Sequence, residues 1–169
     1  MLEDLYNISR TLRFVAWLDG DFDFSPLMDE WIGETRKELD FVNEARNMVD
    51  VKAVLDKSGL DVIVPTLFPE YTSKKTLVMT YCEGFKIIDR EKLNACDMDR
   101  EELMEVTCRA FAFQIFVGGL FNGDPHPGNI LIQPYVDSQG RNKARPVLLD
   151  WGLTKRLKPS MRLGFAKFL

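Results

Sequence analysis

The sequence is poor in the residues that hold zinc or build disulfide frameworks. Its 169 residues include three cysteines and one histidine, and no two cysteines have the CxxC spacing. An odd number of separated cysteines predicts neither a disulfide scaffold nor a cysteine-based zinc site, so we expect a reducing compartment. The fold must then depend on its own core, and a chain of this length can bury about 70% of its unfolded surface.

Long apolar runs are also missing. The longest, residues 111–121, is interrupted by Gln114 and is too short to span a bilayer. The opening residues, MLEDLYNISR, have neither the apolar core of a signal peptide nor the Arg- and Ser-rich composition of a transit peptide. We therefore expect any organellar address to lie upstream of this chain.

Basic charge is not in surplus either. The net charge of −4 disfavours a nucleic-acid-binding surface, because such surfaces need an excess of lysine and arginine. Phosphate ligands are still allowed if a metal ion offsets the acidic groups. Apolar residues make up 46% of the chain and charged residues 28%, close to the averages for soluble domains. The composition therefore predicts one globular domain.

Apolar residues at spacings of three and four predict helices over residues 2–18 and 25–57. In the first helix, one face carries Leu5, Ile8, Leu12, Val15 and Leu18. The second helix begins near Ser25, a suitable N-cap, with Pro26 at the first helical position, and it ends before Gly59.

Two short strands are predicted after the second helix. Residues 61–71 form a β-branched run cut by Pro65 and Pro69, and residues 74–84 have the composition of a buried strand. We expect these strands to form a small sheet on which the preceding helix packs.

A third helix is predicted over residues 99–121, because Asp99 and Glu102 have the capping-box spacing. The turn-rich residues 137–143 then separate two β-rich segments, ILIQPYV and ARPVLLD. This arrangement predicts a β-hairpin.

The segment between the third helix and the hairpin, FNGDPHPGNILI, contains the only histidine. Its Asp-Pro, Pro-Gly and Gly-Asn pairs are typical of a structural turn. Phosphoryl transfer offers a second interpretation, since that chemistry needs a carboxylate to orient or deprotonate the acceptor and metal ligands to neutralise a triphosphate. Asp124 and Asn129 have the five-residue spacing of the base and the metal ligand in kinase catalytic loops.

Asp150, Trp151 and Gly152 follow the second strand of the hairpin, where kinases carry a metal-binding Asp followed by an aromatic residue and Gly. Hard oxygen ligands of this kind suit Mg²⁺, which takes its other ligands from water and substrate phosphates. Each piece alone is weak evidence, but the ordered set of helix, Asp-x4-Asn, hairpin and Asp-aromatic-Gly is specific. His126, fixed between two prolines, is expected to make a loop-shaping hydrogen bond rather than to act in catalysis.

The second helix carries Glu38, Asp40 and Glu44 within two turns. In kinases a glutamate of the corresponding helix pairs with the lysine that grips the nucleotide phosphates. The alternative is a solvated acidic face, because basic neighbours support exposed helices. Such neighbours are present here as Arg36, Lys37 and Arg46.

Three blocks, KELDFVNEARN, FNGDPHPGNILI and VLLDWGLTKRL, resemble in order the signatures of the UbiB-type atypical kinases, also called the aarF-domain family. The resemblance implies an α+β, protein-kinase-like fold. Residues 1–84 would be a partial smaller lobe, made of a helix and a short antiparallel sheet. Residues 85–169 would begin a mostly helical larger lobe with a catalytic-loop β-hairpin. ATP and Mg²⁺ are the implied cofactors, and isoprenoid quinone or related lipid metabolism is the implied role.

Carried over by motif, the resemblance makes Asp124 the catalytic-loop carboxylate. Asn129 and Asp150 would be the metal ligands. Glu44 would be the helix glutamate that pairs with the phosphate-gripping lysine and so supports catalysis.

Further roles follow from the same resemblance. Glu38 and Asp40 would form the acidic pair that distinguishes the family, and the backbone near Tyr81 and Cys82 would be the hinge facing adenine. The implied partners are a nucleotide and an unidentified phosphate acceptor, with a lipid or quinone precursor as the candidate, and no nucleic acid. The implied compartment is a mitochondrion or plastid, where the protein could associate peripherally with a membrane; otherwise we would expect the cytoplasm.

The chain departs from the family pattern in several places. It has no KxGQ segment, no Ala-rich or Gly-rich phosphate loop and no VAVK-like strand with its lysine. We therefore expect a fragment whose enzymatic activity is open: feeble or absent turnover alone, and ATP hydrolysis or phosphotransfer in the full-length parent. Asn122 stands where the family often has histidine, and Trp151 where phenylalanine is usual.

Two other interpretations stay open. Small-molecule phosphotransferases of the aminoglycoside and choline kinase type have a similar catalytic loop and an Asp-Trp-Gly segment, but they lack ELDFVNEARN. A non-catalytic remnant that senses a nucleotide or serves as a scaffold would fit the missing lysine.

Overall fold

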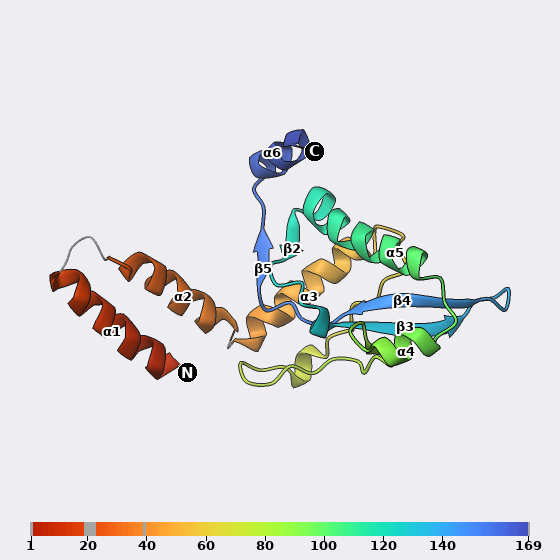
Figure 1. Ribbon diagram of the computed structural model, residues 1–169, viewed down its shortest axis with the longest axis horizontal. Coiled ribbons are helices and arrows are strands. Elements are labelled where there is room, and N and C mark those ends of the chain that lie inside the picture. Colours follow the sequence, from red (N-terminus) through yellow and green to blue (C-terminus); the bar gives the residue numbers. More distant parts are fainter. Residues whose placement is uncertain (1, 19–22, 39, 169) are drawn as a thin grey trace.

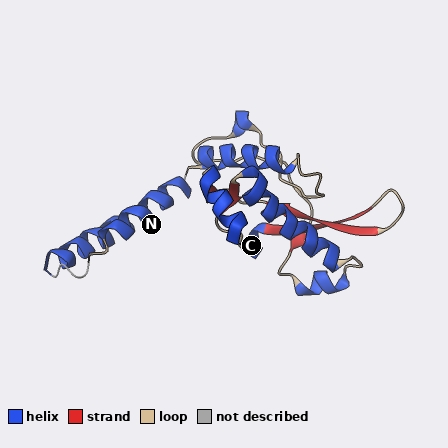
Figure 2. Cartoon of the chain, turned by 90° about the horizontal axis from the view of Figure 1, so that it is seen from above, coloured by secondary structure: helices blue, strands red, loops and turns tan. Residues whose placement is uncertain are grey.

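The computed structural model describes residues 2–18, 23–38 and 40–168. A helical hairpin projects from a larger body that contains the sheets (Figures 1 and 2). The hairpin consists of α1 (Leu2–Leu18) and α2 (Ser25–Glu38). The helices of the body are α3 (Phe41–Leu55), α4 (Arg90–Ala95), α5 (Arg100–Phe113) and α6 (Pro159–Phe168). Its strands are β1 (Phe85–Lys86), β2 (Leu120–Asn122), β3 (Ile130–Val136), β4 (Asn142–Leu148) and β5 (Thr154–Arg156).

The helical hairpin has a small core of its own. Leu5 of α1 and Met28 and Ile32 of α2 are buried together, and an ion pair of 2.7 Å joins Arg13 to Asp29 across the two helices. The predicted apolar face of the first helix is therefore wrong in part. Ile8 is 46% exposed, because a single partner helix covers only a narrow stripe of α1.

The long second helix predicted over residues 25–57 is also wrong, since it is two helices. Asp40 is the N-cap of α3, and its Oδ1 accepts a hydrogen bond of 3.1 Å from the backbone N–H of Val42. An aspartate side chain that binds nearby backbone N–H groups favours a helix start over a helix interior. Leu39 lies outside the described residues, and α3 starts at Phe41.

The core of the larger body forms around α3. Met48, Val51 and Leu55 of this helix are almost completely buried. They pack against residues from the segment after α3, from α5, from the sheets and from the loop after β4, namely Val64, Ala110, Leu120, Ile130, Leu148 and Trp151. Segments from residues 48 to 151 thus meet in one core, which holds the loops described below in place.

The two strands predicted over residues 61–71 and 74–84 are reduced to isolated bridges. Leu67 pairs with Met79 in an antiparallel bridge, and residues 74–84 are all half-buried or exposed. The segment is short of backbone donors because Pro65 and Pro69 have no N–H, which limits a regular ladder. The prediction of a buried strand there is wrong; regular pairing begins only at β1.

The β-hairpin prediction is confirmed. Strands β3 and β4 pair antiparallel from Ile130 opposite Leu148 to Val136 opposite Asn142, and β1 joins the free side of β3. The β-hairpin of β3 and β4 extends to one side of the body (Figure 1). Its turn is held by Asp137, whose Oδ1 accepts hydrogen bonds from two backbone N–H groups of the turn.

The third predicted helix is shorter than expected. Asp99 caps α5, since its Oδ1 accepts hydrogen bonds of 2.9 and 3.0 Å from the N–H groups of Glu101 and Glu102. After Phe113 the helix widens into one π-turn, Gln114–Gly118, and stops at Gly119, whose φ of 65° is left-handed. Residues 120–122 then form β2, which pairs with β5. A glycine in the left-handed region is a common helix terminator.

The structure is therefore an α+β fold with small antiparallel sheets, as predicted. No helix in the described part of the chain combines the length and apolarity needed to cross a bilayer.

Candidate functional site

The short β2–β5 pair brings two separate loops together. It sets residues 120–122 opposite residues 154–156, and Gly123 continues the pairing with a hydrogen bond of 2.8 Å to the carbonyl of Leu153. A side chain at position 123 would place its Cβ 2.8 Å from that carbonyl oxygen, so only glycine allows this approach. The loop containing Asp124 and the segment containing Asp150 therefore lie side by side.

Between these loops and the start of α3 lies a cavity of about 470 Å³. Three carboxylates from three separate segments contribute to its wall: Glu44, Asp124 and Asp150. The other lining residues are Phe41, Leu149, Gly152 and Leu153. The sequence prediction named all three carboxylates as site residues, and the fold places them around one space.

Asp150 is held by hydrogen bonds at both carboxylate oxygens. Its Oδ2 accepts a bond of 2.9 Å from Nδ2 of Asn129, and its Oδ1 accepts one of 3.0 Å from the backbone N–H of Gly152. The backbone carbonyl of Asp150 accepts a bond of 2.7 Å from Nδ2 of Asn122. The side chain predicted to bind a metal is thus fixed in orientation before any ligand arrives.

Asn122 links the two loops directly. Its Nδ2 donates to the Asp150 carbonyl, while its Oδ1 accepts a bond of 2.8 Å from the backbone N–H of Asp124. The Asp124 residue itself is exposed. One neutral amide therefore connects the backbones of the two acidic residues. Asparagine, like the histidine that the family often has at this position, offers both a donor and an acceptor.

The predicted loop-shaping hydrogen bond of His126 is confirmed. Its Nδ1 accepts a hydrogen bond of 3.0 Å from the backbone N–H of Gly128, which closes the short 3₁₀ turn Pro127–Asn129. A Cβ at position 128 would lie 2.8 Å from that nitrogen. The histidine and the glycine together shape the loop that presents Asn129.

Glu44 is buried at the inner end of the cavity. Its Oε1 lies 3.5 Å from the backbone nitrogen of Trp151, which donates to it. Burial raises the pKa of the Glu44 carboxyl, and the negative charge of Asp150 raises it further. No lysine pairs with Glu44 among the residues that the structure describes.

Asn47, one turn after Glu44, contacts the same residue from the other side. Its Nδ2 donates a hydrogen bond of 3.0 Å to the carbonyl of Trp151, and the Trp151 side chain is completely buried. The sequence analysis missed both Asn47 and the bridging role of Asn122. The spacing of three residues from Glu44 could have placed Asn47 on the same helix face, but its partner 104 positions away has no signal in the sequence.

The other predicted site residues are not among those that line the cavity. Tyr81 is 89% exposed, and Cys82 is half-buried with its Sγ 3.8 Å from the Thr80 carbonyl; neither lines the cavity wall. Asp40 acts as the N-cap of α3. Glu38 ends α2, but its side chain lies outside the described part of the structure.

The donor set fits Mg²⁺. Within the described residues no three His, Cys, Asp or Glu side chains gather into a metal cluster, so an ion would need non-protein ligands. Asn129 uses its Nδ2 to bind Asp150, which leaves its amide oxygen for a cation beside the carboxylate. One amide and one carboxylate are the kind of partial set that Mg²⁺ completes with waters and phosphate oxygens.

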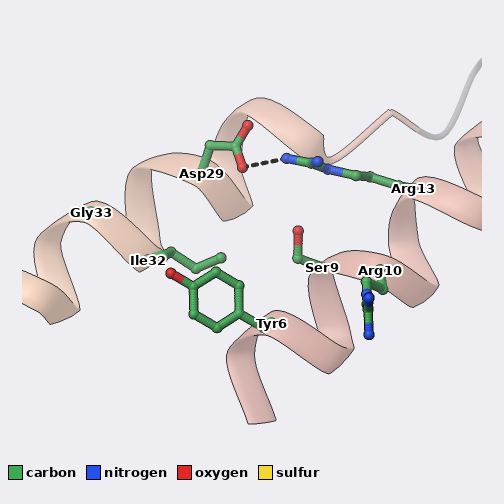
Figure 3. A pocket seen from close by; sticks show the side chains of 7 residues that line it. All are labelled: Tyr6, Ser9, Arg10, Arg13, Asp29, Ile32 and Gly33. Atoms are coloured by element: carbon green, nitrogen blue, oxygen red, sulfur yellow. Dashed lines mark hydrogen bonds and ion pairs between the residues drawn. The ribbon is translucent and has the colours of Figure 1, made fainter. Parts of the chain in front are cut away.

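A second cavity, of about 540 Å³, lies in the helical hairpin far from these loops (Figure 3). Tyr6, Ser9 and Arg13 of α1 face Asp29 and Ile32 of α2 there, and the Arg13–Asp29 ion pair closes one side. It contains none of the predicted site residues.

Comparison with known proteins gives a match over the whole chain. The ABC1 atypical kinase-like domain matches residues 1–169. A probable serine/threonine-protein kinase, abkB, of Dictyostelium discoideum is 33% identical over 96% of this chain and 24% of its own length. The AarF domain-containing protein kinase 1 of Gallus gallus is 32% identical over 98% of this chain and 31% of its own length. An aarF domain-containing protein kinase of Arabidopsis thaliana, named as chloroplastic, is 34% identical over 91% of this chain and 20% of its own length.

The chain thus spans less than a third of the length of these curated relatives. Among solved structures, the Rio2 kinase of Chaetomium thermophilum in a complex with ADP/Mg²⁺ and phosphoaspartate is similar, at 20% identity and a TM-score of 0.44. That likeness covers 80% of this chain and 38% of the other.

Proposed function

The chain belongs to the family of ABC1 atypical kinase-like domains, and on that premise we propose that its cavity binds ATP with Mg²⁺ for phosphotransfer or hydrolysis. The observation that carries this proposal is the joint position of Asp124, Asn129 and Asp150. Asp124 and Asp150 line one cavity, and Asn129 donates to Asp150 within 2.9 Å. Three residues from two separate segments supply the groups that phosphoryl transfer requires.

Each residue has a distinct role in this proposal. Asn129 and Asp150 hold the ion through an amide oxygen and a carboxylate. Mg²⁺, when bound, neutralises charge on the nucleotide phosphates. Asp124, exposed at the rim of the cavity, orients the attacking hydroxyl or water and accepts its proton. The acceptor itself is open, and a lipid or quinone precursor is our candidate.

We also propose a division into two lobes, residues 1–84 and 85–169. Phe41 and Glu44 then reach the cavity from the first lobe, and the catalytic and metal-binding loops from the second. The segment around Tyr81 and Cys82 follows the bridge at Met79 and precedes β1, so it joins the two lobes. Its backbone is our candidate for the contact with adenine. Glu38 and Asp40 are our candidates for the acidic pair that distinguishes the family, and Asp40 caps the helix that carries Glu44.

The cellular role is proposed from the family. Support for quinone or lipid metabolism comes from the motif resemblance, and support for an organelle comes from a relative named as chloroplastic. Each of the relatives given above is named as a protein kinase.

A second function, nucleotide binding without turnover, is favoured by one specific observation. Glu44 is buried beside Asp150 and binds a backbone N–H instead of a lysine in the described part of the chain. For this segment taken alone, with no lysine on the phosphates, the metal and its two ligands would carry most of the binding.

The test measures Mg²⁺-dependent ATP binding and hydrolysis in the protein at its complete natural length. Asp150→Asn should weaken Mg²⁺-dependent binding and lower any turnover by at least about 100-fold, because it removes a charged metal ligand. Asp56→Asn, an exposed carboxylate at the end of α3, is the matched control and should change neither. Binding with no turnover in the wild type would favour the second function. Unchanged binding in Asp150→Asn would reject both.

A further inference from the structure

The Asp150–Trp151 pair is gripped by three asparagine amides from three places in the chain. Asn122 donates to the Asp150 carbonyl, Asn129 to the Asp150 carboxylate and Asn47 to the Trp151 carbonyl, at 2.7, 2.9 and 3.0 Å. Asn122 and Asn129 belong to the catalytic loop and its approach. Asn47 is different, because it comes from α3 and is only 6% exposed.

Helix α3 holds the Trp151 residue at both of its backbone polar groups. Glu44 accepts from its N–H at 3.5 Å and Asn47 donates to its carbonyl at 3.0 Å. Both bonds are buried, where a hydrogen bond is electrostatically stronger than in water, and the Asn47 bond has the better length. Asn47 therefore makes the better of the two hydrogen bonds that fasten the metal-binding loop to α3.

We propose that Asn47 is a positioning residue that fixes the Asp150–Trp151 segment to α3 and so sets the place of the Asp150 carboxylate for the cation. This inference rests on the proposed binding of Mg²⁺ and nucleotide. Asn47 itself does not touch the ion or the nucleotide in this proposal. It acts through the backbone of Trp151, the residue that follows the metal ligand.

The choice of an amide has a physical reason. A lysine or arginine at position 47 would bring positive charge next to a cation site and repel the ion. An aspartate would add a third acidic group beside Glu44 and Asp150, and its carboxylate could not donate to a carbonyl. A neutral amide donates the bond without changing the charge of the site.

Thr154 provides a matched comparison on the same acceptor. Its Oγ1 donates a hydrogen bond of 2.9 Å to the same Trp151 carbonyl, but it lies only three residues further along the same segment. Loss of Thr154 Oγ1 removes a bond to that carbonyl without releasing the loop from α3. Loss of the Asn47 amide removes the hydrogen bond that ties this carbonyl to α3 and still leaves the carbonyl one partner.

The experiment compares Asn47→Leu with Thr154→Val at the complete natural length of the protein. Calorimetric titration with ADP at a series of Mg²⁺ concentrations gives the Mg²⁺ level for half-maximal nucleotide binding, without any measurement of activity. Asn47→Leu should raise that level by about 10-fold, the lower end of the effect of losing a group that orients a metal ligand. Thr154→Val should leave it unchanged. Thermal melting without metal checks that each variant folds, and Asn47→Ala replaces Asn47→Leu if the larger side chain prevents folding.

The outcomes separate the two proposals. A folded Asn47 variant with the Mg²⁺ requirement of the wild type would overturn the positioning role, while the Mg²⁺ dependence of the wild type and its loss in Asp150→Asn would stand. An equal rise in Thr154→Val would also overturn it, because tethering to α3 would then not be the cause. Nucleotide binding that ignores Mg²⁺ in the wild type would reject the proposed function and this inference with it.

Discussion

Glu44 shows how a single side chain can be costly to the fold and useful to the site. It is buried, its charge is opposed by Asp150, and its one described partner is the backbone N–H of Trp151 at 3.5 Å. Burying a carboxylate with so little compensation destabilises a folded chain. A position that costs stability and faces a cavity with a second carboxylate is typical of a functional residue.

The pH dependence of stability tests this view of Glu44. Because its folded pKa is raised above the ordinary value of 4.5, its stabilising effect is complete below about that pH and is lost as the pH rises through the raised value. Glu44→Gln should therefore make the 169-residue chain more stable than the wild type at pH 7. The difference should shrink as the pH falls toward 4.5. Urea unfolding at both values measures it, and a difference that is independent of pH would contradict the assignment.

The π-turn that follows α5 packs closely against α3. The π-turn Gln114–Gly118 brings Gly118 against α3, where a Cβ would lie 2.6 Å from Cγ1 of Val54. The side chain of Gln114 is fully buried, and neither end of its amide has a partner among the described residues. The chain therefore leaves α5 through a wide turn. Strand β2 follows at Leu120 and pairs with β5.

Gly118→Ala should lower the free energy of unfolding by about 1–3 kcal/mol, since overpacking costs more than the helix preference of alanine restores. The cause can be isolated, because Val54→Ala removes the atom that the new methyl group would meet. In the double variant the effect of Gly118→Ala should be smaller by at least about 0.5 kcal/mol. Equal effects with and without Val54 would show that the close contact is not responsible. Chemical denaturation of the four proteins completes the cycle.

The molecule as a whole has two cores of unequal size. The core around α3 joins residues from Met48 to Trp151, whereas the helical hairpin relies on Leu5, Met28 and Ile32 with one half-buried neighbour. The hairpin projects from the body (Figures 1 and 2), and large side chains such as Trp17 stay exposed on it. We therefore expect the hairpin to open locally without unfolding the site.

Two buried methionines provide a matched test of this division. Met48→Ala in α3 should lower global stability by about 2–5 kcal/mol, as large-to-small changes in a core do. Met28→Ala in α2 should leave the main unfolding transition in place and should speed amide hydrogen exchange only in α1 and α2. A common loss of protection throughout the chain in Met28→Ala would show a single cooperative unit instead.

The sequence by itself determined the local features and the order of the motifs. Short-range spacing predicted the Asp99 cap, the β-hairpin and the His126 hydrogen bond, because each depends on residues close together in the chain. The family also followed from three contiguous blocks. Prediction failed where a residue could serve either of two local structures, as at Asp40, or where prolines interrupted a strand pattern, as in residues 61–71.

Only the tertiary structure decided which distant groups meet. The contacts of Asn47 with Trp151 and of Asn122 with Asp150 join residues 104 and 28 positions apart, and an amide leaves no periodic signal of its partner. The common cavity of Glu44, Asp124 and Asp150 likewise exists because β2 pairs with β5 and α3 packs beneath the loop. Spacing along a chain encodes local geometry, whereas convergence of three segments depends on a core that must form first.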